Sequence, residues 1–261
     1  MDHMRRARAA VLPLSLSPYP GRTRMADRGF GGNGRTARRT NGHRPQPTKT
    51  RPRLPRAAAG IVMEALNRAL FLWINAPAQP AAGTVPMAMF FAEYAIWLAP
   101  LALVAGWLWG EPSTRRHALQ AAVTAVLALL INVGFGLAWD HPRPFAIGLG
   151  HNLLPHVADS SFPSDHLTLL WAVAFSLLWH PHLRRAGVAL ALLGLPMAWA
   201  RIYLGVHYPF DMVGAAAVAA FSAWLCSGRV AHTLSEPLHR LGLAVHAVAL
   251  APCVRRGWVR K

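Results

Sequence analysis

Long apolar segments follow one another along the chain from residue 87 onward. A helix needs about twenty apolar residues to cross the hydrocarbon core of a bilayer. Five segments approach or reach that length, namely residues 87–109, 118–139, 166–179, 186–204 and 210–225. The third of these is short and could begin inside the preceding loop. The pattern predicts an all-α fold, a polytopic bundle of five membrane-spanning helices.

Two further segments flank these spans. Residues 61–75 read IVMEALNRALFLWIN, an apolar helical pattern that Glu64, Asn67 and Arg68 interrupt. This segment is expected either to lie along the membrane surface or to form a sixth, imperfect span. Residues 229–261 form a basic tail with an apolar middle, which suits a second surface-lying helix. The predicted membrane domain therefore covers residues 60–228.

The composition changes the picture mainly at the N-terminus. The chain is 54% hydrophobic and 14% charged, which is poor in polar residues for a soluble domain of 261 residues. Residues 1–59 hold fourteen basic and two acidic residues, or +12 of the total +17. We expect this Pro- and Gly-rich arm to be disordered, because it cannot bury enough apolar surface. It lacks aromatic interleaving, zinc spacing and a recognition helix, so no nucleic-acid partner is expected.

The short loops give an orientation, because cytoplasmic loops collect Lys and Arg. With five spans, one side receives the basic tail and Arg115, Arg116, Arg184 and Arg185. That side is predicted to be cytoplasmic, and the loop 140–165 and the junction near residue 207 then lie on the outer face. The basic arm would also lie outside. This conflict disappears if residues 61–75 span the membrane or if translation starts near Met63.

Two polar clusters lie between the predicted second and third spans, one directly after the second span and one at the start of the third. The first, Asp140-His141-Pro142-Arg143-Pro144, holds an arginine between two prolines, and a stiff backbone suits a guanidinium that binds phosphate oxygens in pairs. An interfacial anchor is the alternative for this arginine. The second cluster runs from Ser160 to His166 and predicts a helix start, where free N–H groups attract an anion. A role as a helix cap explains the presence of Ser164, but it does not explain why His166 lies one turn into the helix on the outer face.

The third cluster runs from Arg201 to Asp211. His207 and Asp211 are four residues apart and can meet on one face if the segment is helical. A carboxylate that binds one imidazole nitrogen fixes the tautomer and leaves the other nitrogen free as a nucleophile. The predicted topology brings all three clusters to the same membrane surface, so we expect one site there.

The order Arg-Pro, Pro-Ser-x-His and Arg-x5-His-x3-Asp resembles the three-part signature of the type 2 phosphatidic acid phosphatase superfamily. Within it, HPRPFAIGLGH, DSSFPSDH and ARIYLGVHYPFDMVGA, with MEALNRALFLWINA upstream, resemble the bacterial undecaprenyl-diphosphatases. The resemblance covers about residues 63–226. It implies a metal-free, cofactor-free hydrolysis of undecaprenyl diphosphate to the monophosphate, which recycles the cell-wall lipid carrier. The enzyme would lie in the bacterial inner membrane with its site on the outer face.

The resemblance also implies a role for each residue. His207 attacks the terminal phosphorus to form a phosphohistidine, and Asp211 orients it. His166 protonates the leaving oxygen and later activates water. The phosphoryl oxygens would be held by Arg143, Arg201 and Ser164.

Three departures from the family pattern stand out. Gly136 occupies the position of a phosphate-binding lysine, and His141 is the hypothesised substitute for that cation. Asp165 replaces a glycine and is expected to position His166 or to tune its pKa. Ala200 replaces a serine.

Two other functions fit the residues. The first is the same chemistry on another lipid phosphate, such as phosphatidylglycerophosphate or phosphatidic acid. The second is a transporter that binds a metal or a proton through its His and Asp residues, although the neighbouring arginines would repel a cation. The sequence predicts membrane lipids and a polyprenyl diphosphate as partners, and it does not determine the oligomeric state.

Overall fold

The computed structural model describes residues 56–260, and its regular elements there are all helical. Nearly all of the arm predicted for residues 1–59 therefore lies outside the described residues. The elements are α1 (Arg56–Ile74), α2 (Thr84–Met89), η1 (Phe90–Tyr94), η2 (Ala95–Trp97), α3 (Leu98–Trp109), α4 (Pro112–Ala138), η3 (Pro144–Ile147), α5 (Asp165–Leu178), α6 (Arg184–Tyr203), α7 (Pro209–Ser227), α8 (Arg229–Ala249) and α9 (Ala251–Arg255).

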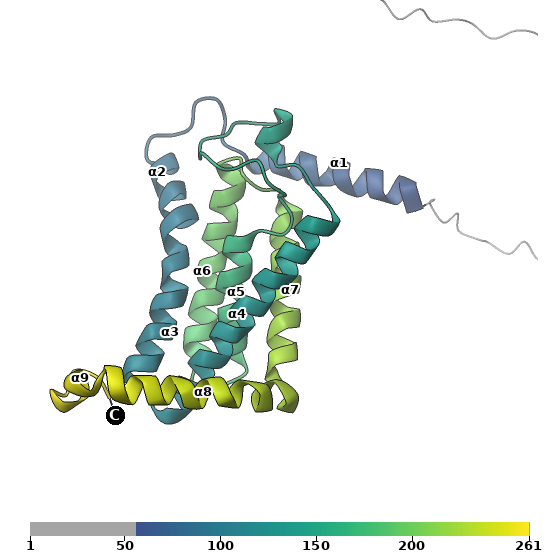
Figure 1. Cartoon of the computed structure of the whole chain (residues 1–261). Coiled ribbons are helices and arrows are strands. Elements are labelled where there is room, and N and C mark those ends of the chain that lie inside the picture. The colour runs from purple at the N-terminus through teal and green to yellow at the C-terminus, as the bar shows by residue number, and fades with distance from the viewer. Residues whose placement is uncertain (1–55, 261) are drawn as a thin grey trace, which may run out of the picture. The chain divides into compact units, whose positions relative to one another are not determined.

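Four helical segments are long and apolar enough to cross a membrane, and they run side by side in Figure 1. They are Thr84–Trp109, Pro112–Ala138, Arg184–Tyr203 and Pro209–Ser227. The predicted third span is the shorter apolar helix α5. Large apolar side chains such as Leu137, Leu192 and Val213 stay exposed on the outside of the bundle. The prediction of a polytopic helical bundle is confirmed, and the chain is a multi-pass membrane protein.

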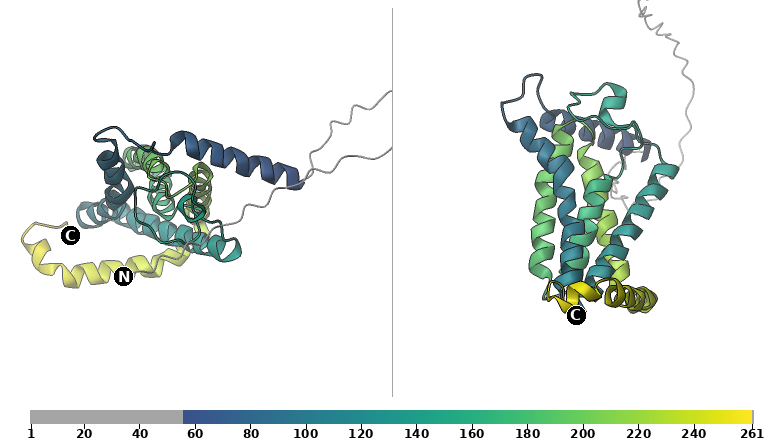
Figure 2. Two further views of the ribbon diagram at one scale, coloured as in Figure 1. Left: turned by 90° about the horizontal axis from the view of Figure 1, so that it is seen from above. Right: turned by 60° about the vertical axis from the view of Figure 1, so that its left-hand side comes forward.

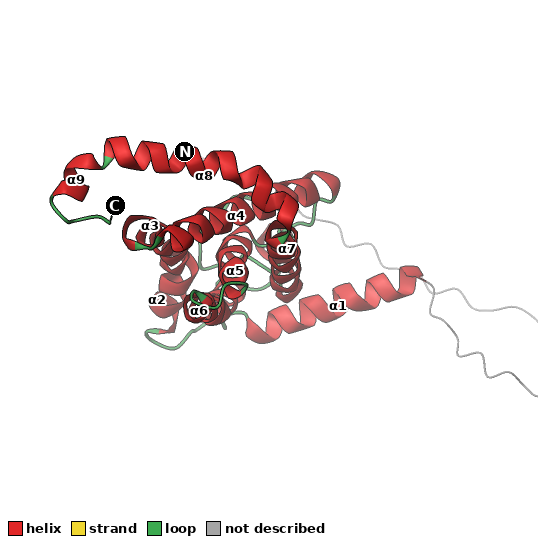
Figure 3. Cartoon of the chain, turned by 90° about the horizontal axis from the view of Figure 1, so that it is seen from below, coloured by secondary structure: helices red, strands yellow, loops and turns green. Residues whose placement is uncertain are grey.

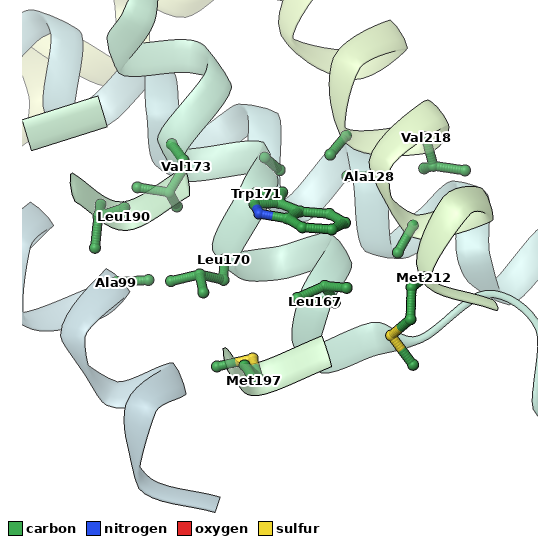
Figure 4. Packing of buried hydrophobic residues seen from close by; sticks show 14 of the residues in the cluster. Ala99, Ala128, Leu167, Leu170, Trp171, Val173, Leu190, Met197, Met212 and Val218 are labelled. Atoms are coloured by element: carbon green, nitrogen blue, oxygen red, sulfur yellow. The ribbon is translucent and has the colours of Figure 1, made fainter. Parts of the chain in front are cut away.

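The short helix α5 is the centre of the bundle and packs against α4, α6 and α7 (Figure 3). Leu167, Leu170 and Trp171 form the core with Met197 of α6 and Met212 of α7 (Figure 4). Because α5 is surrounded by other helices instead of lipid, it does not need the length of a full span. The chain before it can therefore fold into the end of the bundle, between the longer helices (Figure 1).

Helices α5 and α6 approach closely at Gly194. A Cβ at this position would overlap the indole of Trp171, whose Nε1 donates to the Ala191 carbonyl at 3.1 Å. Small residues let membrane helices approach in this way, where lipid provides little drive for association. The contact fixes α6, which carries Arg201 near its C-terminal end.

The first span is irregular next to the site. It passes from α2 through the π-helical turn η1 and the 3₁₀ turn η2 into α3. Such turns displace backbone carbonyls from regular helical bonding, and these need another donor inside a membrane. Arg201 is that donor for Ala92, whose carbonyl lies 3.3 Å from Nη1.

Helix α1 lies across the end of the bundle that holds the long loop between α4 and α5 (Figures 1 and 2). It is not among the helices that are long and apolar enough to span. The buried Asn67 accepts from the Phe210 backbone N–H, and Asn75 binds the backbone of His151 and of Tyr203. Asn67 of α1 and the adjacent Asn75 thus bind segments of the site end, and the place of α1 favours the surface-lying alternative over a sixth span.

The opposite end of the bundle is crossed by α8 (Figures 1 and 2). Gly242 of α8 packs against the ring of Trp107, which also meets the rings of His239 and His246 edge-on. The basic tail is therefore helical over Arg229–Ala249, as its pattern suggested.

Candidate active site

His207 is positioned by the turn that joins α6 to α7. The chain reverses at Gly205, where φ is 88° and a Cβ would collide with the His151 carbonyl. A side chain is strained at such a φ, so glycine suits this position. His207 follows two residues later with 1% of its surface exposed.

Asp211, in the first turn of α7, holds one nitrogen of this imidazole. Its Oδ2 lies 3.1 Å from His207 Nδ1. The same oxygen accepts from the Tyr208 backbone N–H at 2.8 Å and from the Ser161 hydroxyl. Because a carboxylate accepts hydrogen bonds, Nδ1 carries the proton and the lone pair lies on Nε2. The predicted pair therefore meets where α7 begins.

Two buried arginines face the free nitrogen of His207. Arg143 Nη1 lies 3.0 Å from Nε2, and Arg201 Nη2 lies 3.4 Å from it. A guanidinium only donates, so both contacts agree with a lone pair on Nε2. The first and third sequence clusters thus meet at one nitrogen.

Arg143 is fixed in place by several contacts. Its Nε donates to Asp159 at 2.8 Å, Nη1 to the Val206 carbonyl at 2.9 Å and Nη2 to the Ser160 carbonyl at 3.3 Å. Pro142 and Pro144 restrict the backbone on both sides, and the Arg143 carbonyl accepts from the Ala146 N–H at the start of η3. It is a preorganised donor and not a snorkelling anchor, since only 4% of its surface is exposed.

The pKa of His207 lies well below the ordinary value of 6.5. Burial is the largest cause, followed by the positive charges of Arg201 and Arg143. Desolvation and like charges both disfavour the charged imidazole. His207 is therefore neutral near pH 7, which is the state in which Nε2 can act as a nucleophile.

The start of α5 borders the same centre. Ser164 is fully buried as the N-cap residue, and its Oγ has no hydrogen-bond partner within residues 56–260. Its backbone N–H faces the Asp211 carbonyl at 3.4 Å. A free hydroxyl and a helix N-terminus together can bind an anion.

His166 lies one residue into α5 and is partly buried. It lines a cavity of about 430 Å³ together with Glu93, Ile96, Trp97, Pro100 and Leu169. No hydrogen bond to its ring occurs among the described residues. His166 therefore lines a mostly apolar recess between the first span and α5.

The two auxiliary candidates point to other partners. His141 Nε2 lies 3.5 Å from Glu64 of α1, and its ring meets the ring of Tyr208 edge-on. Asp165 accepts from Asn132 at 2.8 Å. Within the described part of the chain, neither side chain bonds His166, His207 or the two arginines. The structure thus provides no contact for the roles that the sequence suggested for His141 and Asp165.

Three residues of the site received no role from the sequence, although Asp159 and Ser161 lie within the motif DSSFPSDH. Ser161 binds Asp211, Asp159 binds Arg143, and His156 Nε2 lies 3.2 Å from Arg201 Nη2. All three belong to the long segment between η3 and α5, which has no apolar period to interpret. The length of that segment is itself a signal, because long irregular loops in compact domains are commonly functional.

A polytopic bundle that holds a buried, neutral histidine between two arginines has the groups that a membrane phosphatase requires. The chain belongs to the PAP2 superfamily, which residues 117–232 match. It is an enzyme of the lipid phosphatase class.

Named relatives agree with this assignment. The chain is 36% identical over 203 residues to YbjG of Escherichia coli K12, a provisionally assigned undecaprenyl-diphosphatase, which covers 76% of this chain and 100% of that protein. It is 40% identical over 137 residues to the undecaprenyl-diphosphatase BcrC of Bacillus subtilis 168, covering 52% and 70% of the two chains. In fold, it resembles the crystal structure of a PAP2-type phosphatidylglycerolphosphate phosphatase from Bacillus subtilis, with a TM-score of 0.50, 18% identity and coverage of 66% and 89%.

Proposed function

We propose that this protein hydrolyses undecaprenyl diphosphate to undecaprenyl phosphate and inorganic phosphate. The observation that carries the proposal is the lone pair of His207 Nε2 between Arg143 and Arg201. Phosphoryl transfer depends mostly on positioning and on stabilising charge, and this centre supplies both. The names of the relatives support the diphosphate lipid as the substrate.

In the first step, His207 Nε2 attacks the terminal phosphorus. An N–P bond forms, and the bond from phosphorus to the oxygen of undecaprenyl phosphate breaks. Both guanidinium groups move their donors from Nε2 to the phosphoryl oxygens, with the Ser164 hydroxyl beside them. His166 protonates the leaving oxygen. The imidazole becomes positive as it reacts, and Asp211 stabilises that charge.

In the second step, neutral His166 takes a proton from water, and the resulting hydroxide attacks the phosphohistidine. The N–P bond breaks and returns the lone pair to His207, and inorganic phosphate leaves. The cycle consumes one water and restores both histidines.

The recess beside His166 suits the lipid part of the substrate. Its apolar side chains Ile96, Trp97 and Leu169 line the same cavity as His166. A polyprenyl chain can occupy such a recess while its diphosphate reaches Arg201. The tail then stays within the hydrocarbon region.

The distribution of charge favours the outer face of the cytoplasmic membrane for this reaction. Arg115 and Arg116 of α4 and Arg184 and Arg185 of α6 lie at the helix ends next to α8, opposite the site. Because cytoplasmic ends collect positive charge, we place the α8 end inside and the site outside.

Phosphate release from undecaprenyl diphosphate by purified protein tests the proposal. Wild type is expected to release phosphate in the presence of a chelator, and His207→Ala and His166→Ala are not. A panel with phosphatidylglycerophosphate and phosphatidic acid tests the lipid preference. Faster turnover of either glycerolipid would replace undecaprenyl diphosphate as the substrate, and activity retained in His207→Ala would overturn the nucleophile.

A further inference from the structure

His156 lies inside the site although it belongs to none of the sequence motifs. It is partly buried, its Nε2 lies 3.2 Å from Arg201 Nη2, and its ring centroid lies 6.4 Å from that of His207. Its other nitrogen, Nδ1, lies 3.1 Å from the Val157 carbonyl. One arginine thus contacts the nitrogen lone pairs of two histidines.

These contacts fix the protonation state of His156 in the empty site. A carbonyl only accepts, so Nδ1 carries a hydrogen. A guanidinium only donates, so Nε2 carries a lone pair, and the ring is neutral. Its pKa agrees with this state, because burial lowers it most and the charges of Arg143 and Arg201 lower it further, against the Val157 carbonyl and Asp159.

An entering phosphate group changes the partner of His156. The oxyanion takes the Nη2 donor of Arg201, and the Nε2 lone pair then faces negative charge. A lone pair beside an oxyanion is repulsive, whereas an N–H is a charge-assisted donor to it. A nearby negative charge therefore favours the imidazolium.

The groups around His156 decide how strongly it responds. Arg143 and Arg201 oppose its protonation, and Asp159, whose Oδ1 lies 3.9 Å from Nδ1, favours it. His207 and His166 border the same centre. A dianion that neutralises the two arginines removes the main opposition.

We propose that His156 is a phosphate-binding residue that is neutral in the empty site and takes up one proton from solvent as the anion enters. The N–H bond forms at Nε2. His156 then supplies a third positive charge beside Arg143 and Arg201. The inference deepens the proposed function, since it rests on a phosphoryl group as the ligand.

The proposed role of His156 also accounts for Gly136, which occupies the position of a phosphate-binding lysine in the family pattern. His141, which the sequence suggested as the substitute cation, bonds Glu64 of α1. His156 bonds Arg201 and thus lies where a third charge can reach the anion. A charge that appears only with substrate avoids a permanent third cation among buried arginines.

Binding of inorganic sulfate to the detergent-solubilised protein tests the proposal. Sulfate stays a dianion through the neutral range, so any proton taken up on binding enters the protein. Isothermal titration calorimetry at pH 7.5 in two buffers with different ionisation enthalpies measures that uptake. Wild type should take up protons, and His156→Gln should take up fewer by as much as one per site and bind sulfate about tenfold more weakly.

Further variants separate this role from a structural one. His156→Lys carries a fixed positive charge. It should therefore bind sulfate as tightly as wild type but take up fewer protons on binding, as His156→Gln does. His151→Gln alters another histidine of the same loop, whose ring lies against the Ala76 carbonyl, and should behave as wild type. His166→Gln measures how much of the proton uptake comes from His166. Equal proton uptake and equal affinity in His156→Gln and wild type would overturn the proposal.

The sulfate experiment does not depend on which lipid the enzyme hydrolyses. If no lipid phosphate is hydrolysed but sulfate binding still takes up a proton through His156, the proposed function fails and this inference stands. If hydrolysis proceeds and His156→Gln binds sulfate as wild type does, the inference fails alone.

Discussion

The two ends of the helical bundle both bury arginine, but they use it differently. At the α8 end, Arg115 has 4% of its surface exposed and donates to the Arg260 carbonyl, and nearby Gln120 donates to the Cys226 carbonyl. At the other end, Arg143 and Arg201 also bond carbonyls, but each keeps a donor on His207 Nε2. Burial of charge is common to both ends. What distinguishes the site is convergence of the donors on one reactive lone pair.

Removal of His207 Nε2, the nitrogen that both arginines contact, is expected to have the largest effect on catalysis. His207→Ala should lower phosphate release by at least about 10⁴-fold, since it removes the nucleophile. His182→Ala, an exposed histidine at the α8 end, is the matched control and should retain wild-type activity. A His207→Ala enzyme with a tenth of the wild-type rate would remove the basis of the comparison.

The next largest effect is expected from the orienting carboxylate. Asp211→Asn can donate to Nδ1 and so favours the tautomer in which Nε2 carries the proton and has no lone pair. We expect kcat to fall about 10³-fold or more, with sulfate affinity unchanged. An equal loss of both would instead indicate that the pocket has collapsed.

Removing one arginine should cost less. Arg201→Gln is expected to lower kcat/KM by about 10²-fold, the usual cost of one donor to a developing oxyanion. Arg201→Lys should not restore it, because a single ammonium cannot replace a fork that contacts Ala92, His156 and His207. Full activity of the lysine variant would show that only the charge matters.

The pH dependence gives a smaller but more specific effect. The pKa of His207 is lowered by burial and by both arginines, so the ring stays neutral as the pH falls past the ordinary histidine value. The acid limb of kcat/KM, which reports the free enzyme, should therefore lie below pH 6.5. In Arg201→Gln the limb should move upward, because one of the causes is gone. A wild-type limb above that value would contradict the electrostatics of the site.

The smallest catalytic effect is expected at the other end of the bundle. Arg115→Gln should change the turnover rate by less than about twofold. It should lower stability by about 1–3 kcal/mol, because the Arg260 carbonyl loses one of its two donors, the other being His246 Nε2. Thermal unfolding in detergent and phosphate release, measured on the same sample, separate the two effects. A large loss of turnover with normal stability would contradict the distinction between the two ends, because it would give Arg115 a role in catalysis.

The sequence predicted the part of the site that depends on short spacing. His207 and Asp211 lie four residues apart around a helix start, and the span pattern brought Arg143 and Arg201 to the same end. The position of His156 and the contact of Ser161 with Asp211 could not be found this way, because an irregular loop places both residues. His141 was misleading for the same reason. Its neighbour in sequence is Arg143, but its partner Glu64 comes from α1, and only tertiary structure joins them.

Prediction of the fold from the sequence was limited in the same way by contacts that only tertiary structure makes. The long apolar runs predicted the spans, whereas the short α5 required knowing that other helices surround it. The polar residues of α1 looked like flaws in a membrane span. One of them, Asn67, instead binds the start of α7, and Asn75, directly after α1, binds the end of α6.

The covalent step on His207 is the central claim, and trapping it is the most direct test. His166→Ala enzyme is mixed with undecaprenyl diphosphate labelled in its terminal phosphate, quenched in alkali to preserve phosphohistidine, digested and mapped by mass spectrometry. Label is expected on the peptide that contains His207, and none is expected in the double variant that carries His166→Ala and His207→Ala. Label on another residue, or equal label in the double variant, would contradict the claim.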